Sequence, residues 1–133
     1  MKLIVYTDGA SRGNPGPSSY GFSIMDKEKK ILYEEGKYLG INTNNFAEYS
    51  AVLAALIYIQ KNFEKAFITF FMDSKLVVEQ LSGRYKIKSL SLKVLIDQIK
   101  ELGQKIGPTT YSHIPREKNK IADFLANKVL DSL

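Results

Sequence analysis

A chain of 133 residues without cysteine fits one domain that buries its own core, and it excludes a disulfide framework and a thiolate metal site. Its 44% apolar and 25% charged residues are typical of a globular protein, and its net charge of +5 favours a polyanionic partner without identifying one. The apolar run from Leu3 to Tyr6 is too short for a signal peptide or a membrane span. We therefore expect a single domain over residues 1–133 that is cytoplasmic, monomeric and not bound to a membrane.

The first third of the chain predicts three strands, over residues 2–7, 19–25 and 30–39. The first is β-branched and aromatic, and we expect Asp8 to end it. Residues 11–17 hold two Gly and two Pro and predict a loop. The second and third strands enclose a short polar tip, so they predict an antiparallel hairpin.

A helix is expected from Asn45, because alanine and other apolar residues recur there at helical spacing without Gly or Pro. Thr43, Asn44 or Asn45 can cap its start. Glu48 falls in its first turn, where the helix dipole favours an acid.

The rest of the chain predicts strands reached through helical crossovers. Residues 66–72 are continuously apolar, which indicates a strand buried on both faces, as in a parallel sheet. The other expected elements are a helix from Ser74 to Leu81, a helix from Leu90 to Leu102 that Gly103 stops, a strand over residues 109–114, and a last helix from Lys118 with Ala122, Leu125, Ala126, Val129 and Leu133 on its apolar face. This order predicts an α/β fold with a five-stranded mixed sheet, three strands antiparallel and then two parallel, flanked by helices.

Four acids stand where chemistry in such folds is found. Asp8 and Asp73 each follow a strand, and ligands of open α/β sheets bind at the carboxyl ends of parallel strands. Glu48 begins a helix, and Asp123 borders the apolar stripe of the last one. Each acid taken singly also fits an ordinary turn, cap or surface role. Together, in a chain without Cys or clustered His, they indicate a hard-cation site for Mg²⁺ or Mn²⁺, whose charge relieves the repulsion among carboxylates.

Four blocks of sequence, in this order, resemble the motifs of type 1 ribonucleases H. YTDGASRGNPGP, from Tyr6 to Pro17, is similar to the opening signature of that family, and TNNFAE, from Thr43 to Glu48, to its Asn-Asn-x-x-Glu helix start. Met72-Asp73-Ser74 resembles its Asp-Ser block, and HIPREKNKIAD, residues 113–123, its terminal His-to-Asp block. Each block alone is a weak match, but all four in order cover nearly the whole chain. The resemblance implies a ribonuclease H-like fold.

The resemblance also implies an activity, the endonucleolytic hydrolysis of the RNA strand of RNA–DNA hybrids, which leaves 5′-phosphate and 3′-hydroxyl ends. It implies that Asp8, Glu48, Asp73 and Asp123 bind two Mg²⁺ ions, for which Mn²⁺ can substitute, and that the ions clamp the attacking and leaving oxygens. His113 matches the mobile histidine of the family, which helps proton transfer or product release. As the only histidine, it also fits a plain residue at a strand end.

Several polar residues match the family positions that contact the nucleic acid. An amide both donates and accepts, so asparagines can read base edges and the 2′-hydroxyl in the minor groove of a hybrid. Turn and capping roles are the alternative for the asparagines. The glycines are expected to keep their loop low enough for the backbone to approach the nucleic acid. The candidates are Asn14, Asn44 and Asn45 for the minor groove, Thr43 and Ser74 for backbone phosphates, and Gly9 with Gly13 for the close approach.

One region departs from the family pattern. Many members carry a long basic insertion rich in Trp and Lys after the second helix, whereas here only GRYKIKS, residues 83–89, stands in that place and the chain has no Trp. Arg84, Lys86 and Lys88 are the charges that could grip the DNA strand instead, although ordinary solvated surface also accounts for them. The departure puts in doubt how strongly DNA is required opposite the RNA, so double-stranded RNA is a second candidate partner.

Two other functions remain open on the sequence alone. A binding module that keeps the fold without cleaving is one, although a pure binder has no reason to concentrate acids beneath a phosphate. A junction resolvase or transposase core is the other, although the asparagine set and the His113 block argue against it.

Overall fold

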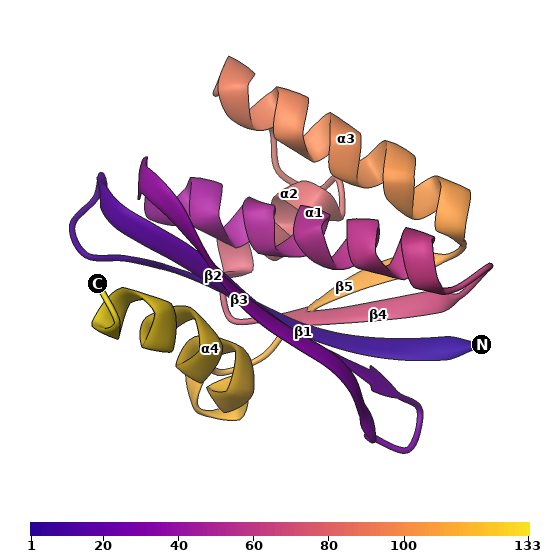
Figure 1. Ribbon diagram of the computed structural model, residues 1–133. Helices are drawn as coiled ribbons and strands as arrows, with labels where there is room; N and C mark the ends of the chain where they lie inside the picture. Colours follow the sequence, from indigo (N-terminus) through magenta and orange to yellow (C-terminus); the bar gives the residue numbers. More distant parts are fainter.

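The computed structural model describes residues 1–133 and contains one five-stranded sheet with the strand order β3-β2-β1-β4-β5. The strands are β1 (Lys2–Ser11), β2 (Gly16–Asp26), β3 (Ile31–Asn42), β4 (Phe67–Met72) and β5 (Thr109–His113). The pairs β1–β2 and β2–β3 are antiparallel, whereas β1–β4 and β4–β5 are parallel. The predicted hairpin and the predicted mixed sheet are therefore confirmed (Figure 1).

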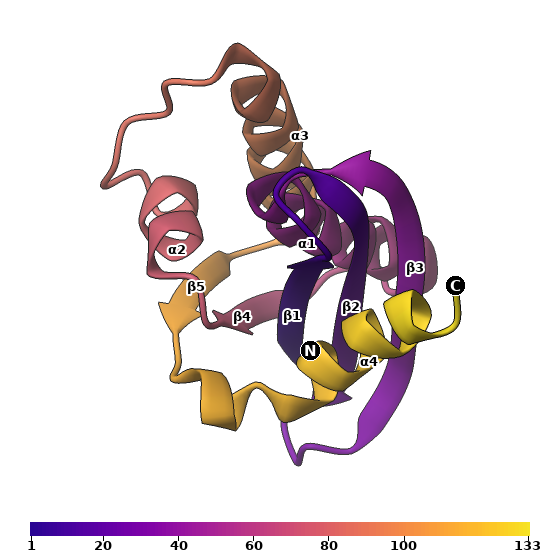
Figure 2. The ribbon, with the colours of Figure 1, turned by 90° about the vertical axis from the view of Figure 1, so that its left-hand side faces the viewer.

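Helices cover the two faces of this sheet unequally. They are α1 (Asn44–Asn62), α2 (Lys75–Leu81), α3 (Leu90–Ile106) and α4 (Lys120–Asp131), with a short 3₁₀ turn, η1 (Arg116–Lys118), ahead of α4. The first three lie on one face and α4 lies on the other (Figure 1). Helix α4 packs across β1, β2 and β3 and leaves β4 and β5 beyond its reach (Figure 2). No helix has the length and apolar character that a bilayer crossing requires.

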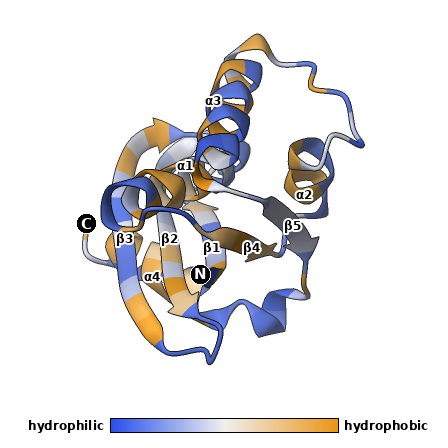
Figure 3. Ribbon diagram, turned by 90° about the vertical axis from the view of Figure 1, so that its right-hand side faces the viewer, coloured by the Kyte–Doolittle hydropathy of each residue, from blue (hydrophilic) through white to orange (hydrophobic).

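The main core lies between the sheet and α1, α2 and α3. Strand β4 contributes Ile68, Phe70 and Met72 to it, all with 1% or less of their surface exposed, and its hydrophobic character is visible in Figure 3. Its opposite face is not buried as predicted, because α4 does not reach it: Phe67 is 56% exposed. On that open face Phe71 stacks on Tyr6 of β1, with ring centroids 5.3 Å apart.

Helix α4 packs close to the sheet because the residue of β2 beneath it, Gly21, has no side chain. A Cβ atom on Gly21 of β2 would lie 2.5 Å from the carbonyl oxygen of Ala122, so any side chain there would push α4 away. Nearby, the Ser19 hydroxyl donates a 2.5 Å hydrogen bond to the carbonyl of Ala126. These contacts hold α4 against β2.

Several predicted boundaries were wrong, among them two strand ends: β2 begins at Gly16 rather than at residue 19, and β3 ends at Asn42 rather than at residue 39. Helix α3 runs through Gly103 to Ile106, because Gly103 lies buried against Thr109 and the helix ends at Gly107 instead. The last helix begins at Lys120, after the η1 turn, rather than at Lys118. It ends before Leu133, which is 70% exposed, and Leu130 completes the apolar face.

Candidate active site

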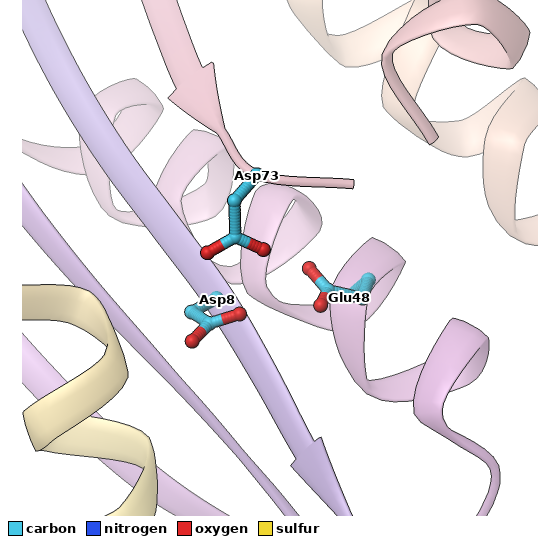
Figure 4. Close-up of side chains that lie close together, drawn as sticks. All are labelled: Asp8, Glu48 and Asp73. Atoms are coloured by element: carbon cyan, nitrogen blue, oxygen red, sulfur yellow. The ribbon is translucent and has the colours of Figure 1, made fainter. Parts of the chain in front are cut away.

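Three carboxylates from three elements meet at one edge of the sheet. One carboxylate oxygen from each of Asp8, Glu48 and Asp73 lies within 4.8 Å of the others, and their side chains point toward one another in Figure 4. Asp73 directly follows β4. Asp8 does not end β1, which continues to Ser11 along β2, but it lies just beyond the last pair between β1 and β4, Tyr6 with Phe71. The parallel part of the sheet therefore does end at these two acids, as predicted.

Glu48 reaches the cluster because α1 sits directly on β1. It does not lie in the first turn of α1, which holds no acid, so it does not offset the helix dipole as predicted. A Cβ on Gly9 would lie 2.5 Å from the backbone carbon of Ala47 and 2.8 Å from its Cβ. Only glycine at this position lets the helix approach closely enough for Glu48 to face Asp8. Gly9 thus has a packing duty that the sequence did not reveal.

Burial and the close spacing of these carboxylates make it unfavourable for all of them to be ionised at once. Burial, and then the charge of Asp73, raises the pKa of Asp8 from 3.8 to about 8. Burial, and then the charges of Asp8 and Asp73, raises the pKa of Glu48 well above its ordinary value. The Glu48 Oε2 atom is buried without a hydrogen-bond partner. An all-oxygen donor set with an unpartnered buried oxygen fits a hard divalent cation, which would relieve the repulsion.

Asp123 is not one of the three clustered acids, but it lies close enough to Asp8 to contribute to the raised pKa of that residue. Its Oδ1 atom accepts a hydrogen bond of 3.1 Å from Asn127 Nδ2, and the Arg116 guanidinium lies 3.8 Å away. The Asp123 side chain is 35% exposed and lines the same cavity of about 420 Å³ as the three clustered acids. The structure therefore places the fourth predicted carboxylate at the wall of the site rather than within the cluster.

Six of the predicted substrate-contact residues line this cavity or the one next to it. Asn44, Asn45, Gly9 and Ser74 line it, and Asn14, Thr43 and Asn45 line an adjoining cavity of about 490 Å³. The helix cap is Thr43, whose Oγ1 accepts from the backbone N–H of Phe46 at 3.2 Å. The side chains of Asn44 and Asn45 do not cap the helix, so they are available to contact a ligand.

The comparisons with known proteins agree with this geometry. A family profile described as "Reverse transcriptase-like" matches residues 6–129. The structure of LC11-RNase H1 in complex with an RNA/DNA hybrid matches with a TM-score of 0.94 and 39% identity over 98% of both chains. RNase H1 from the archaeon Halobacterium salinarum matches with a TM-score of 0.94 and 36% identity over the full length of both chains. The chain belongs to the ribonuclease H family. Both the predicted family and the predicted fold are confirmed.

Curated sequences add relatives that are longer than this ribonuclease H domain. Ribonuclease HI of Halobacterium salinarum is 39% identical over 98% of the chain, which spans 65% of that protein. A bifunctional protein of Mycobacterium tuberculosis is 40% identical over 99% of the chain, which spans 36% of that protein. The chain thus spans about a third of the mycobacterial relative and under two thirds of the archaeal one.

His113 lies outside the carboxylate cavity of this ribonuclease H domain. It is exposed at the end of β5, paired in register with Met72, and it does not line the cavity. His113 lies near Glu79 of α2 instead. The pKa of Glu79 is lowered mainly by the hydrogen bond from Arg84, and His113 makes the smallest contribution. The catalytic role of His113 stays a prediction.

The segment 83–89 is anchored to α2 at its beginning. Arg84 forms a two-pronged ion pair with Glu79, through Nε at 2.5 Å and Nη2 at 3.1 Å, and its backbone N–H donates to the Glu79 carbonyl. Lys86 and Lys88 are exposed and make no ion pair. Of the three predicted DNA-strand contacts, only these two lysines thus carry charge that is free for a phosphate.

Three residues of the site were missed in the sequence: Arg116, Asn119 and Asn127. Arg116 and Asn127 line the cavity, and Asn127 also accepts a hydrogen bond of 3.2 Å from Arg12 in the loop before β2. Asn119 is fully buried behind Asp73. The one available signal was spacing, since Asn127 lies one helical turn after Asp123.

Proposed function

We propose that this protein hydrolyses the RNA strand of RNA–DNA hybrids endonucleolytically, with two divalent ions, and leaves 5′-phosphate and 3′-hydroxyl ends. The observation that carries this proposal is the cluster of Asp8, Glu48 and Asp73, the first two of them buried, in a chain similar to a ribonuclease H1 that binds such a hybrid. We take residues 1–133 as one catalytic domain.

We propose that all four acids bind the ions, from two sides of the cavity. Asp8, Glu48 and Asp73 would bind them from the floor of the cavity, and Asp123 from its wall. Bound Mg²⁺ or Mn²⁺ would supply Lewis acidity to the attacking water and to the departing 3′ oxygen. Because the pKa values of Asp8 and Glu48 are raised, these two residues must release protons before they can act as ligands.

Recognition of the RNA strand is proposed for the asparagines at the start of α1. Asn44 and Asn45 line the carboxylate cavity, so an amide that contacts a 2′-hydroxyl there lies beside the acids. Asn14 supports them, because its Oδ1 accepts the backbone N–H of Asn44 at 3.0 Å. His113 is proposed to carry a proton at the exposed rim or to assist product release. Double-stranded RNA is proposed as a weaker substrate.

The test is a panel of end-labelled substrates: RNA–DNA hybrid, double-stranded RNA and double-stranded DNA, each with Mg²⁺, Mn²⁺ or chelator. We expect cleavage of the hybrid in the presence of either ion, none in chelator, and products whose 3′ ends a polymerase can extend. Asp8→Asn and Asp73→Asn should nearly abolish cleavage while circular dichroism shows an intact fold. Hybrid binding without cleavage in every metal would identify a binding module, and cleavage of double-stranded DNA would identify a different nuclease.

A further inference from the structure

Asn119 contacts three of the four segments that carry the acids. Its side chain is completely buried, and its Nδ2 atom donates to the carbonyl oxygen of Thr7 at 2.9 Å and to Asp73 Oδ2 at 3.2 Å. Its own carbonyl accepts the backbone N–H of Asp123 at 3.2 Å. Thr7 immediately precedes Asp8, so one residue links β1, the end of β4 and the start of α4 at the positions of their acids.

The ordinary duty of an asparagine at this position does not explain the contacts. Asn119 is the residue before α4, where a side-chain oxygen normally caps the free N–H groups of the helix. Here the side chain makes no capping hydrogen bond and turns back into the sheet, and its Oδ1 atom is buried without a partner. A buried polar atom without a partner is unfavourable, so helix capping does not account for this arrangement.

The chemistry of the two acceptors selects asparagine. A backbone carbonyl and a carboxylate both need a donor, and the carboxamide offers two N–H groups on one short side chain. Aspartate would present oxygen to both acceptors, and serine has a single donor. The hydrogen bond occupies Oδ2 of Asp73 and fixes the direction of that carboxylate, as the partners of metal-binding carboxylates do in other proteins.

We propose that Asn119 is a positioning residue that sets the orientation of Asp73 relative to Asp8 and so determines the affinity of the site for divalent cations. This inference rests on the proposed function, because it assumes that the carboxylates bind metal. Asn119 does not touch the substrate or the ion; it acts through Asp73.

The experiment measures metal binding directly, apart from activity. Free Mn²⁺ is counted by electron paramagnetic resonance during titration of the wild-type protein, Asn119→Ala and Asn119→Ser, without nucleic acid. We expect both variants to bind Mn²⁺ about 10-fold to 100-fold more weakly, the usual effect of removing such a partner. Serine is a favourable helix-capping residue and can cap α4 where the Asn119 side chain does not, so Asn119→Ser supplies the measurement if Asn119→Ala does not fold. The Mg²⁺ concentration for half-maximal cleavage should rise in parallel, with KM for the hybrid unchanged.

Ser19→Ala is the matched control, because it also removes a buried hydrogen bond between the sheet and α4 but reaches no acid. It should lower stability in urea and leave Mn²⁺ affinity unchanged. In an Asp73→Asn background, Asn119→Ala should weaken Mn²⁺ binding no further, because the two residues act as one unit. Wild-type affinity in a folded Asn119 variant, or an equal loss in Ser19→Ala, would overturn the inference. A wild-type protein that binds Mn²⁺ without cutting hybrid would overturn only the proposed function, and one that binds no Mn²⁺ would overturn both.

Discussion

Asp8 and Glu48 come from a strand and a helix, yet their carboxylates share one buried site, in which the charge of Asp8 raises the pKa of Glu48 while the side-chain interaction with Glu48 lowers that of Asp8. Asp8 is 5% exposed and Glu48 is 9% exposed, so water offers little screening. The pKa of Asp8 is raised to about 8 and that of Glu48 well above its usual range. The metal-free site therefore holds protons at neutral pH that a bound cation would displace.

The first prediction concerns stability without metal. The unfolded chain releases the Asp8 proton near pH 3.8, whereas the folded protein keeps it until about pH 8. Because the folded state then binds more protons, the free energy of unfolding should fall as pH rises between these values. Urea unfolding in chelator across this range measures the slope. Asp8→Asn should flatten it, and a slope in Asp8→Asn equal to that of the wild type would refute the assignment.

The same protons make metal binding depend on pH. Affinity for Mg²⁺ should increase as pH rises toward about 8 and level off above it, because the ligands must first be deprotonated. Calorimetric titrations in two buffers of different ionisation enthalpy should show protons released on binding at pH 7 and fewer at pH 9. Binding without proton release at pH 7 would mean that the cluster is already ionised.

The second prediction concerns Gly9. An alanine there would collide with the backbone of α1 beside Glu48, so Gly9→Ala should lower stability by about 1–3 kcal/mol and shift Glu48 away from Asp8. Gly107→Ala is the control, because its Cβ would collide with the carbonyl of Ala66 at the other end of β4. Both variants should unfold at lower urea concentration, but only Gly9→Ala should lose kcat with saturating hybrid and metal. Equal losses of kcat would reduce Gly9 to a residue of the general packing.

Much of the fold could be predicted because its signals are local. The Gly- and Pro-rich stretch 11–17 and the polar tip after Asp26 separate the first three strands, and the apolar run 66–72 identifies β4. The burial of β4 on one face only was not predictable from that run, since it depends on where α4 ends its crossing of the sheet.

The same division applies to the site. Asp8 and Asp73 could be placed together because both follow the parallel part of the sheet, and the lack of Cys and of clustered His in the chain added Glu48 and Asp123 to the same predicted cation site. The contacts of Asn119 could not be predicted, because they join positions 46 and 112 residues apart. The pairing of Arg84 with Glu79 also escaped detection, since it depends on the turn at Gly83, where φ is +80°.

The third prediction concerns His113. Its side chain is exposed and makes no hydrogen bond that the fold depends on, so His113→Ala should change stability by no more than about 0.5 kcal/mol. If His113 assists proton transfer, the rate of cleavage should fall by at most about 10²–10⁴-fold, less than in Asp8→Asn. Thr110→Ala, on the same strand and also exposed, should be silent. A loss as complete as that of Asp8→Asn would indicate a metal ligand, and an unchanged rate would make His113 a bystander.

The last prediction separates the three charges of segment 83–89. Lys86 and Lys88 are exposed and unpaired, so changing both to Ala should raise KM for the hybrid and flatten its dependence on salt, with kcat at saturation little changed. Each lost phosphate contact should reduce the log–log salt slope by about 0.9, the value for duplex DNA. Arg84→Ala is the contrasting variant: its charge is already balanced by Glu79, so it should loosen the turn after α2 and alter the salt slope less than either lysine does. Initial rates against hybrid concentration at three salt levels decide between them. Superimposable curves for the double lysine variant and the wild type would show that this segment is solvated surface and that the DNA strand is held elsewhere.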